Sequence, residues 1–182
     1  MNYEVEQKFP VSDAAALEKR LAALGAALAP PISEIDHYYA HPARDFVETD
    51  EALRIRRGDR SSRITYKGPR IDAVTKTRRE IELPLGPDEP SVAGWESLLE
   101  ALGFTPVGEV CKYRRKAKIP WQDRQVEASL DEVVGLGTFI ELELVVEEDD
   151  LDAARASIAS LAEKLGLAGS ERRSYLELLL ED

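Results

Sequence analysis

The 182-residue sequence predicts an α+β fold in which short antiparallel strands form a sheet or barrel with helices packed outside it. Two observations support this prediction. Eight short segments alternate charged and apolar residues with the period of a strand, and turn signals or proline-containing loops separate several of them. Three other segments carry apolar residues at helical spacing, and each is followed by a glycine.

The helical segments are recognised by an apolar stripe that ends at a glycine. In the first of them Ser12 can cap the N-terminus, Leu21 lies on the stripe and Gly25 ends the helix. The second and third segments end before Gly103 and Gly166. We therefore expect helices over residues 12–24, 91–102 and 150–165, and a short fourth helix from residue 170.

The strand-like segments lie between these helices. Some are joined by short hairpin signals, of which "GDRS" and "PWQD" are the clearest, and others by loops that contain proline. We expect strands near residues 2–9, 34–40, 52–58, 62–67, 76–84, 109–119, 124–132 and 137–147. Hairpin connections of this kind favour antiparallel pairing.

Nearly every expected strand has one charged face and one apolar face. Glu4, Glu6 and Lys8 alternate along the first strand, and Glu141 and Glu143 alternate along the last. The other charges aligned in this way include Arg54, Arg56, Lys67, Arg78, Glu80, Lys112, Arg114, Lys116 and Asp131. One interpretation is an open sheet whose charged face meets water. The alternative is a closed barrel whose interior holds these groups together with a ligand, water and ions.

Composition limits the class of partner. The formal net charge is −11, which argues against a general nucleic-acid binder, yet ten of the 24 basic residues fall between Arg54 and Arg79. The single cysteine, Cys111, excludes an intramolecular disulfide. No apolar run approaches the roughly 20 residues of a membrane span, and the N-terminus lacks a signal pattern. We expect a cytoplasmic protein with no membrane partner.

A cavity lined by both signs of charge indicates a particular ligand. Arginine and lysine side chains suit phosphate oxygens, and clustered carboxylates suit Mg²⁺ or Mn²⁺. Together they favour a metal-bound polyphosphate. The backbone phosphate loop GxxxxGK[ST] is missing from the sequence, so side chains from several strands would have to hold the phosphates.

These charged strands resemble the CYTH superfamily, the triphosphate tunnel enzymes. The hallmark ExExK of that family corresponds to Glu4-Val5-Glu6-Gln7-Lys8. The other matching motifs, in the family's order, are "DHYYAHP", "DEALRIRR", "TYKGP", "RREIEL", "KYRRK", "SLDEVVGLGTFIELEL" and "SYLELLL". Because they span residues 4–180, the resemblance implies a single CYTH-like domain over residues 1–182 and a closed eight-stranded antiparallel barrel with a charged tunnel.

The resemblance also implies roles for individual residues. The catalytic residues implied in this way are Glu4, Glu6, Lys8, Glu141 and Glu143. The implied ligands of Mg²⁺ or Mn²⁺ are Glu4, Glu6, Asp131, Glu141 and Glu143. The implied substrate-binding cations are Lys8, Arg54, Arg56, Lys67, Arg78, Lys112, Arg114 and Lys116.

The resemblance predicts an enzyme that acts on a small-molecule triphosphate. The expected reaction is hydrolysis of inorganic, nucleoside or thiamine triphosphate. One alternative is a class IV adenylyl cyclase that converts ATP to cyclic AMP and pyrophosphate, the branch that "HPARDFVETDEALRIR" most resembles. Another alternative is a non-catalytic polyphosphate-binding module. A homodimer is compatible with the family likeness.

Three further side chains need an interpretation. His37 and His41 are four residues apart, but the segment is expected to be extended, so we favour structural or surface roles over a zinc site. Tyr175 lies in the last expected helix, and one interpretation is that it closes the mouth of a tunnel through this helix.

Overall fold

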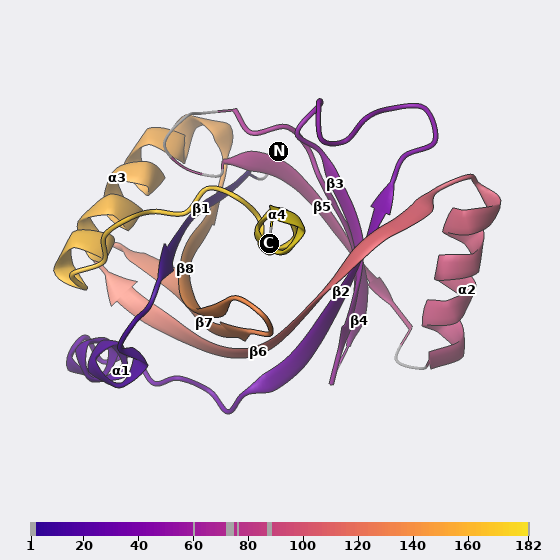
Figure 1. Cartoon of the computed structure of the whole chain (residues 1–182). Helices are drawn as coiled ribbons and strands as arrows, with labels where there is room; N and C mark the ends of the chain where they lie inside the picture. Colours follow the sequence, from indigo (N-terminus) through magenta and orange to yellow (C-terminus); the bar gives the residue numbers. More distant parts are fainter. Residues whose placement is uncertain (1–2, 60, 72–74, 76, 87–88, 182) are drawn as a thin grey trace.

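The computed structural model describes residues 3–59, 61–71, 75, 77–86 and 89–181, and its strands close into an antiparallel barrel (Figure 1). The strands are β1 (Tyr3–Pro10), β2 (Ile32–Ala40), β3 (Ala52–Gly58), β4 (Ser62–Lys67), β5 (Arg78–Leu85), β6 (Thr105–Trp121), β7 (Arg124–Val133) and β8 (Gly137–Val146). Their order around the barrel is β1-β5-β4-β3-β2-β6-β7-β8. The closed-barrel interpretation of the charged faces is therefore confirmed.

The barrel closes through strand β1, which pairs on both of its sides. Its pairing with β8 runs along the whole strand, from Tyr3 opposite Val146 to Pro10 opposite Phe139. Its pairing with β5 covers only Tyr3 and Glu4. Both faces of β1 are buried because Glu4, Glu6 and Lys8 line the tunnel, whereas Val5 and Phe9 pack outward against the helices.

The helices are α1 (Ala14–Ala23), α2 (Glu89–Ala101), α3 (Leu151–Lys164) and α4 (Tyr175–Glu181), with a 3-10 turn at Glu148–Asp150. Figure 1 shows α1 and α3 on one side of the barrel and α2 on the other. The glycines expected to end three of the helices, Gly25, Gly103 and Gly166, all have positive φ, as that role requires.

The hydrophobic core lies between the outer wall of the barrel and these helices. Val5 and Phe9 of β1 belong to one cluster with Leu21 of α1 and Ile158 and Leu161 of α3. Complete burial of a side chain such as Ile158 stabilises the fold by about 1.5–3 kcal/mol. A separate cluster that includes Leu53, Ile55, Val92 and Leu99 forms beneath α2. These two apolar clusters thus lie outside the barrel, which leaves most of its interior for charged groups.

Several boundaries differ from those expected. Asp13, not Ser12, caps α1, because the Asp13 side chain accepts a hydrogen bond of 2.9 Å from the amide of Ala16. Strand β6 begins at Thr105, since it pairs with the end of β2 across an irregularity at Tyr38/Tyr39. The expected strand 76–84 is β5, and its residue 76 lies outside the described residues.

Helix α4 occupies a different position from the other three helices. In Figure 1 it is seen end-on in line with the barrel opening. Its Tyr175 is buried in a cluster with Tyr38, Val110 and Phe139, which come from three different strands. Helix α4 therefore covers one mouth of the barrel. Within the described residues, none of the helices combines the length and apolar character that crossing a bilayer requires.

Candidate active site

The interior of the barrel is a cavity of about 940 Å³ lined mainly by charged and polar side chains of the strands. Glu4, Glu6 and Lys8 of β1 line it and are only 7%, 7% and 1% exposed. The alternation read from the first strand therefore does place these three charges in the tunnel. The carboxylates opposite them on β8, Glu141 and Glu143, line the same cavity.

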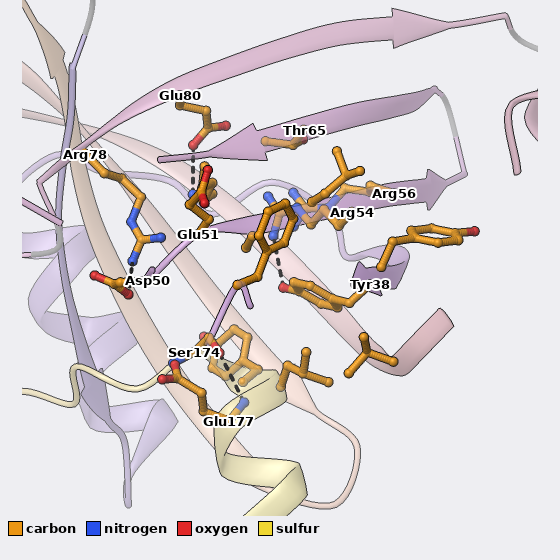
Figure 2. A pocket seen from close by; sticks show the side chains of 18 of the residues that line it. Tyr38, Asp50, Glu51, Arg54, Arg56, Thr65, Arg78, Glu80, Ser174 and Glu177 are labelled. Atoms are coloured by element: carbon orange, nitrogen blue, oxygen red, sulfur yellow. Dashed lines mark hydrogen bonds and ion pairs between the residues drawn. The ribbon is translucent and has the colours of Figure 1, made fainter. Parts of the chain in front are cut away.

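A basic group gathers around one buried carboxylate, Asp36 of β2. Arg56 of β3 donates to both Asp36 oxygens, at 2.6 and 2.8 Å, and Lys112 of β6 donates at 2.7 Å. Arg54 lies 3.3 Å from the same carboxylate. Glu34 adds a second carboxylate beside Arg56 and Lys112, at 3.2 and 3.4 Å. Figure 2 shows Arg54 and Arg56 reaching into the pocket beside Tyr38.

The electrostatics of this group favour an anionic ligand. Burial alone would raise the pKa of Asp36, but Arg54, Arg56 and Lys112 together hold that pKa well below its usual range. For Lys112 the charged form is instead disfavoured, because burial and then the nearby charge of Arg56 lower its pKa to about 8. Three cations therefore face the two carboxylates of Asp36 and Glu34, so an anion entering the tunnel meets a field that remains positive.

We expect the affinity for triphosphate to fall as the pH rises above about 8, the pKa of Lys112. Below that pH the ammonium is present and attracts phosphate, and above it the charge is lost. Lys112→Arg keeps its charge at all accessible pH values, so its affinity should stay level over the same range. Calorimetric titrations with inorganic triphosphate at several pH values measure this effect. An equally steep fall in the arginine variant would assign the pH dependence to another group.

A second cluster links Arg114 of β6 to two acids and to α4. Arg114 makes a bidentate contact with Asp131 of β7 and also reaches Glu141 of β8. The hydroxyl of Tyr175 donates to Asp131 at 2.9 Å. Asp131 was predicted as a metal ligand, but here it is fully buried and accepts from both Arg114 and Tyr175. Its observed contacts hold the guanidinium group of Arg114 in place.

An acidic group, formed by Glu4, Glu6 and Glu143, lies on β1 and β8. Glu6 and Glu143 are directly opposite each other on β1 and β8, and Glu4 follows on the same face. Lys67 contacts Glu4 at 2.9 Å and Glu80 at 2.8 Å. Burial raises the pKa of Glu4, and burial together with the charges of Glu4 and Glu6 raises the pKa of Glu143 to about 8. The carboxylates of this group outnumber its single lysine.

This acidic group has the chemistry of a divalent-cation site. Like charges that face each other across paired strands are destabilising, and after burial this repulsion is the next cause of the raised pKa of Glu143. A cation that takes oxygen ligands would relieve it. As arranged here, no three His, Cys, Asp or Glu side chains of the described residues are placed to hold a metal ion together. The donor types and their register fit Mg²⁺ or Mn²⁺, and bringing them to ligating distance requires side-chain movement.

The predicted residues Arg78 and Lys116 lie at the edges of the cavity. Lys116 is paired with Glu127, and its side chain remains 41% exposed. Arg78 of β5 is 3.7 Å from Asp50, which lies in the loop before β3 (Figure 2). Neither residue joins the groups around Asp36 or Asp131 through the contacts described above.

The sequence analysis did not identify Glu34, and it included Asp36 only as part of the motif "DHYYAHP". Both are almost fully buried, with Glu34 at 6% exposure and Asp36 at 1%. The alternation of side chains along a strand could have identified both residues, because "SEIDHY" places Glu34, Asp36 and Tyr38 on one face of β2. The histidines interpreted as structural lie in ordinary contacts, with His37 at 3.4 Å from Glu109 and His41 accepting from the Ala43 amide.

A closed antiparallel barrel whose charged interior begins with an ExExK strand defines a class of protein, and comparison with family models agrees with it. The CYTH domain model matches residues 2–175, so this chain belongs to the CYTH domain family. The resemblance inferred from the motifs is therefore confirmed.

Individual relatives match along nearly the whole chain. "Putative adenylate cyclase MJ0240" of Methanocaldococcus jannaschii is 35% identical over 178 residues, which cover 96% of this chain and 97% of the relative. Among solved structures, the PH1819 protein from Pyrococcus horikoshii is 42% identical with a TM-score of 0.85, and 98% of each chain is covered. HpAC1 from Hippeastrum, described as having a dominant triphosphatase activity, shares the fold at 18% identity, with a TM-score of 0.65 over 100% of this chain and 96% of its own.

Proposed function

We propose that this protein is a divalent-metal-dependent phosphohydrolase that cleaves a triphosphate held inside the barrel. The observation that carries the proposal is the division of the tunnel interior into a basic group around Asp36 and an acidic group around Glu143. A polyphosphate needs cations to meet its oxygens, and a divalent cation needs carboxylates. Both sets of partners line one cavity.

In this proposal the basic side chains bind and orient the phosphates. Arg54, Arg56 and Arg114 supply guanidinium groups that match phosphate oxygens in pairs, and their contacts to Asp36 and Asp131 hold them in place before substrate arrives. Phosphoryl transfer depends mainly on positioning and charge stabilisation, so a nucleophilic side chain is not required.

The acidic side chains Glu4, Glu6, Glu141 and Glu143 are the proposed ligands of Mg²⁺ or Mn²⁺. When bound, the cation would supply positive charge that stabilises the negative charge developing on the phosphate oxygens. Glu4, Glu6 and Glu143 face one another on β1 and β8, whereas Glu141 also contacts Arg114. Because the wall around them is apolar and packed against helices, bulk water is kept from the sides of the site.

Adenylyl cyclisation is the second candidate reaction, and the name of the 35% identical relative favours it. In a cyclase the ribose 3′-hydroxyl of ATP attacks the α-phosphorus, so cyclic AMP and pyrophosphate are released. In a hydrolase water attacks the terminal phosphorus, the diphosphate is the leaving group, and orthophosphate is the second product. The two reactions use the same phosphate cradle and differ in the position of the nucleophile. HpAC1 combines a cyclase name with a dominant triphosphatase activity, so a name within this fold does not choose between them.

One experiment separates the candidates. Purified protein is incubated with Mg²⁺ or Mn²⁺ and, separately, with inorganic triphosphate, ATP and thiamine triphosphate, and the products are resolved. Orthophosphate is the expected product. Formation of cyclic AMP from ATP would show that the reaction is cyclisation and not hydrolysis. Triphosphate binding without any product would leave the third candidate, a non-catalytic polyphosphate-binding module.

A further inference from the structure

The segment that leads into α4 makes three contacts with one residue of β1, Lys8. The amide of Glu171 donates to the Lys8 carbonyl at 2.7 Å. The Lys8 ammonium donates to the carbonyl of Arg173. The same ammonium lies 4.0 Å from the centre of the Tyr175 ring. Glu171, Arg173 and Tyr175 thus all contact Lys8. Glu171 binds its backbone carbonyl, and Arg173 and Tyr175 contact its ammonium group.

Tyr175 is itself held rigidly in the mouth of the barrel. Its side chain is buried, its hydroxyl donates to Asp131, and its ring meets Phe139 edge-on with centroids 5.3 Å apart. The start of α4 is fixed by a reciprocal capping box, in which Ser174 and Glu177 each accept a hydrogen bond from the other's amide (Figure 2). A ring fixed at both its edge and its hydroxyl offers one defined surface to the lysine.

We propose that Tyr175 is a positioning residue of the triphosphate site and that its ring sets the position of the Lys8 ammonium. This inference rests on the proposed function, because it takes Lys8 to bind phosphate. The negative face of an aromatic ring attracts an ammonium group without consuming its hydrogen-bond donors. Lysine is a flexible chain with a point charge, and ordering it before substrate arrives lowers the entropy lost on binding. Packing of α4 near the C-terminus therefore orders the Lys8 side chain of β1, near the N-terminus, for phosphate binding.

The first test compares two substitutions at the same position. Tyr175→Phe keeps the ring and loses the bond to Asp131, whereas Tyr175→Leu loses both. We expect Tyr175→Leu to raise the KM for inorganic triphosphate roughly tenfold with a smaller change in kcat. Tyr175→Phe should restore most of the affinity. Tyr66→Phe is the matched control, since it removes a hydroxyl bond to Glu51 at a position outside the groups described above.

A double-mutant cycle separates positioning from a general effect on packing. If Tyr175 acts through the lysine, Tyr175→Leu should weaken triphosphate binding no further in a protein that already carries Lys8→Met. Equal losses in both backgrounds would overturn the proposal, and so would a wild-type affinity in Tyr175→Leu or equal losses in the Phe and Leu variants. A wild-type protein that binds no triphosphate would instead refute the proposed function.

A measurement on the wild-type protein covers the case in which Tyr175→Leu fails to fold. The aromatic ring current should move the NMR signals of the Lys8 ε-protons upfield of those of solvent-exposed lysines. Signals at the positions of exposed lysines would show that the ring does not hold the ammonium in solution, and would overturn the inference.

Discussion

Glu143→Gln is expected to lower turnover of triphosphate by at least about a hundredfold while leaving triphosphate binding intact or tighter. Glutamine keeps the size of the side chain and removes the charge that a divalent cation requires. Removal of this negative charge also relieves its burial and its repulsion by Glu4 and Glu6, which together raise the pKa of Glu143 to about 8. Glu6→Gln, on the strand directly opposite, should behave in the same way.

The measurement is steady-state turnover together with calorimetric binding of triphosphate for each variant. Glu132→Gln is the matched control, because this glutamate is exposed on β7, the strand that also carries Asp131. A simple polyphosphate binder would show no turnover to lose, and its affinity would rise or stay level. Wild-type turnover in Glu143→Gln would remove the acidic group from the proposed mechanism.

The face of each strand was predictable from the sequence because side chains alternate with a period of two. Glu4, Glu6 and Lys8 were assigned to one face on that basis, and they do line the tunnel. Closure was not predictable from the alternation alone, which also allowed an open sheet with its charges in water, and it was implied by the resemblance to the CYTH superfamily. The helices followed from apolar stripes and terminal glycines, which are local signals.

The height of each residue along the barrel was not predictable in the same way. Lys112, Arg114 and Lys116 share one face of β6, yet Lys112 is almost fully buried and Lys116 is 41% exposed. The alternation of side chains assigns each residue to a face of the strand, but it does not show at which residue the strand leaves the sheet. The true start of β6 was also hidden, because Pro106 and Gly108 read as breakers, whereas the strand continues through them.

The partners of each charge depend on strand order, which no local pattern contains. Asp36 meets Arg56 because β2 pairs with β3, and it meets Lys112 because β2 also pairs with β6. The contact of Tyr175 with Lys8 joins positions 167 apart in the chain, the difference between 175 and 8. Only the closed arrangement reveals these pairs.

Asp36→Asn is expected to lower the free energy of unfolding by about 3–5 kcal/mol, which is the cost of leaving buried charges without their partner. The asparagine fits the same volume, so the loss arises from charge. Arg54, Arg56 and Lys112 would then face one another around a neutral group. Urea unfolding monitored by circular dichroism measures the change.

Triphosphate should reverse much of this loss, because its oxygens supply the missing negative charge to the same three cations. Addition of inorganic triphosphate is therefore expected to raise the Tm of Asp36→Asn more than it raises the Tm of the wild-type protein. Asp150→Asn is the control, since it removes a carboxylate paired with Arg124 outside the tunnel and should change neither stability nor the response to triphosphate by much. If Asp36→Asn unfolded like the wild type, the three cations would have to be solvated in the native state, and the tunnel would not be the preformed anion site on which the proposed reaction depends.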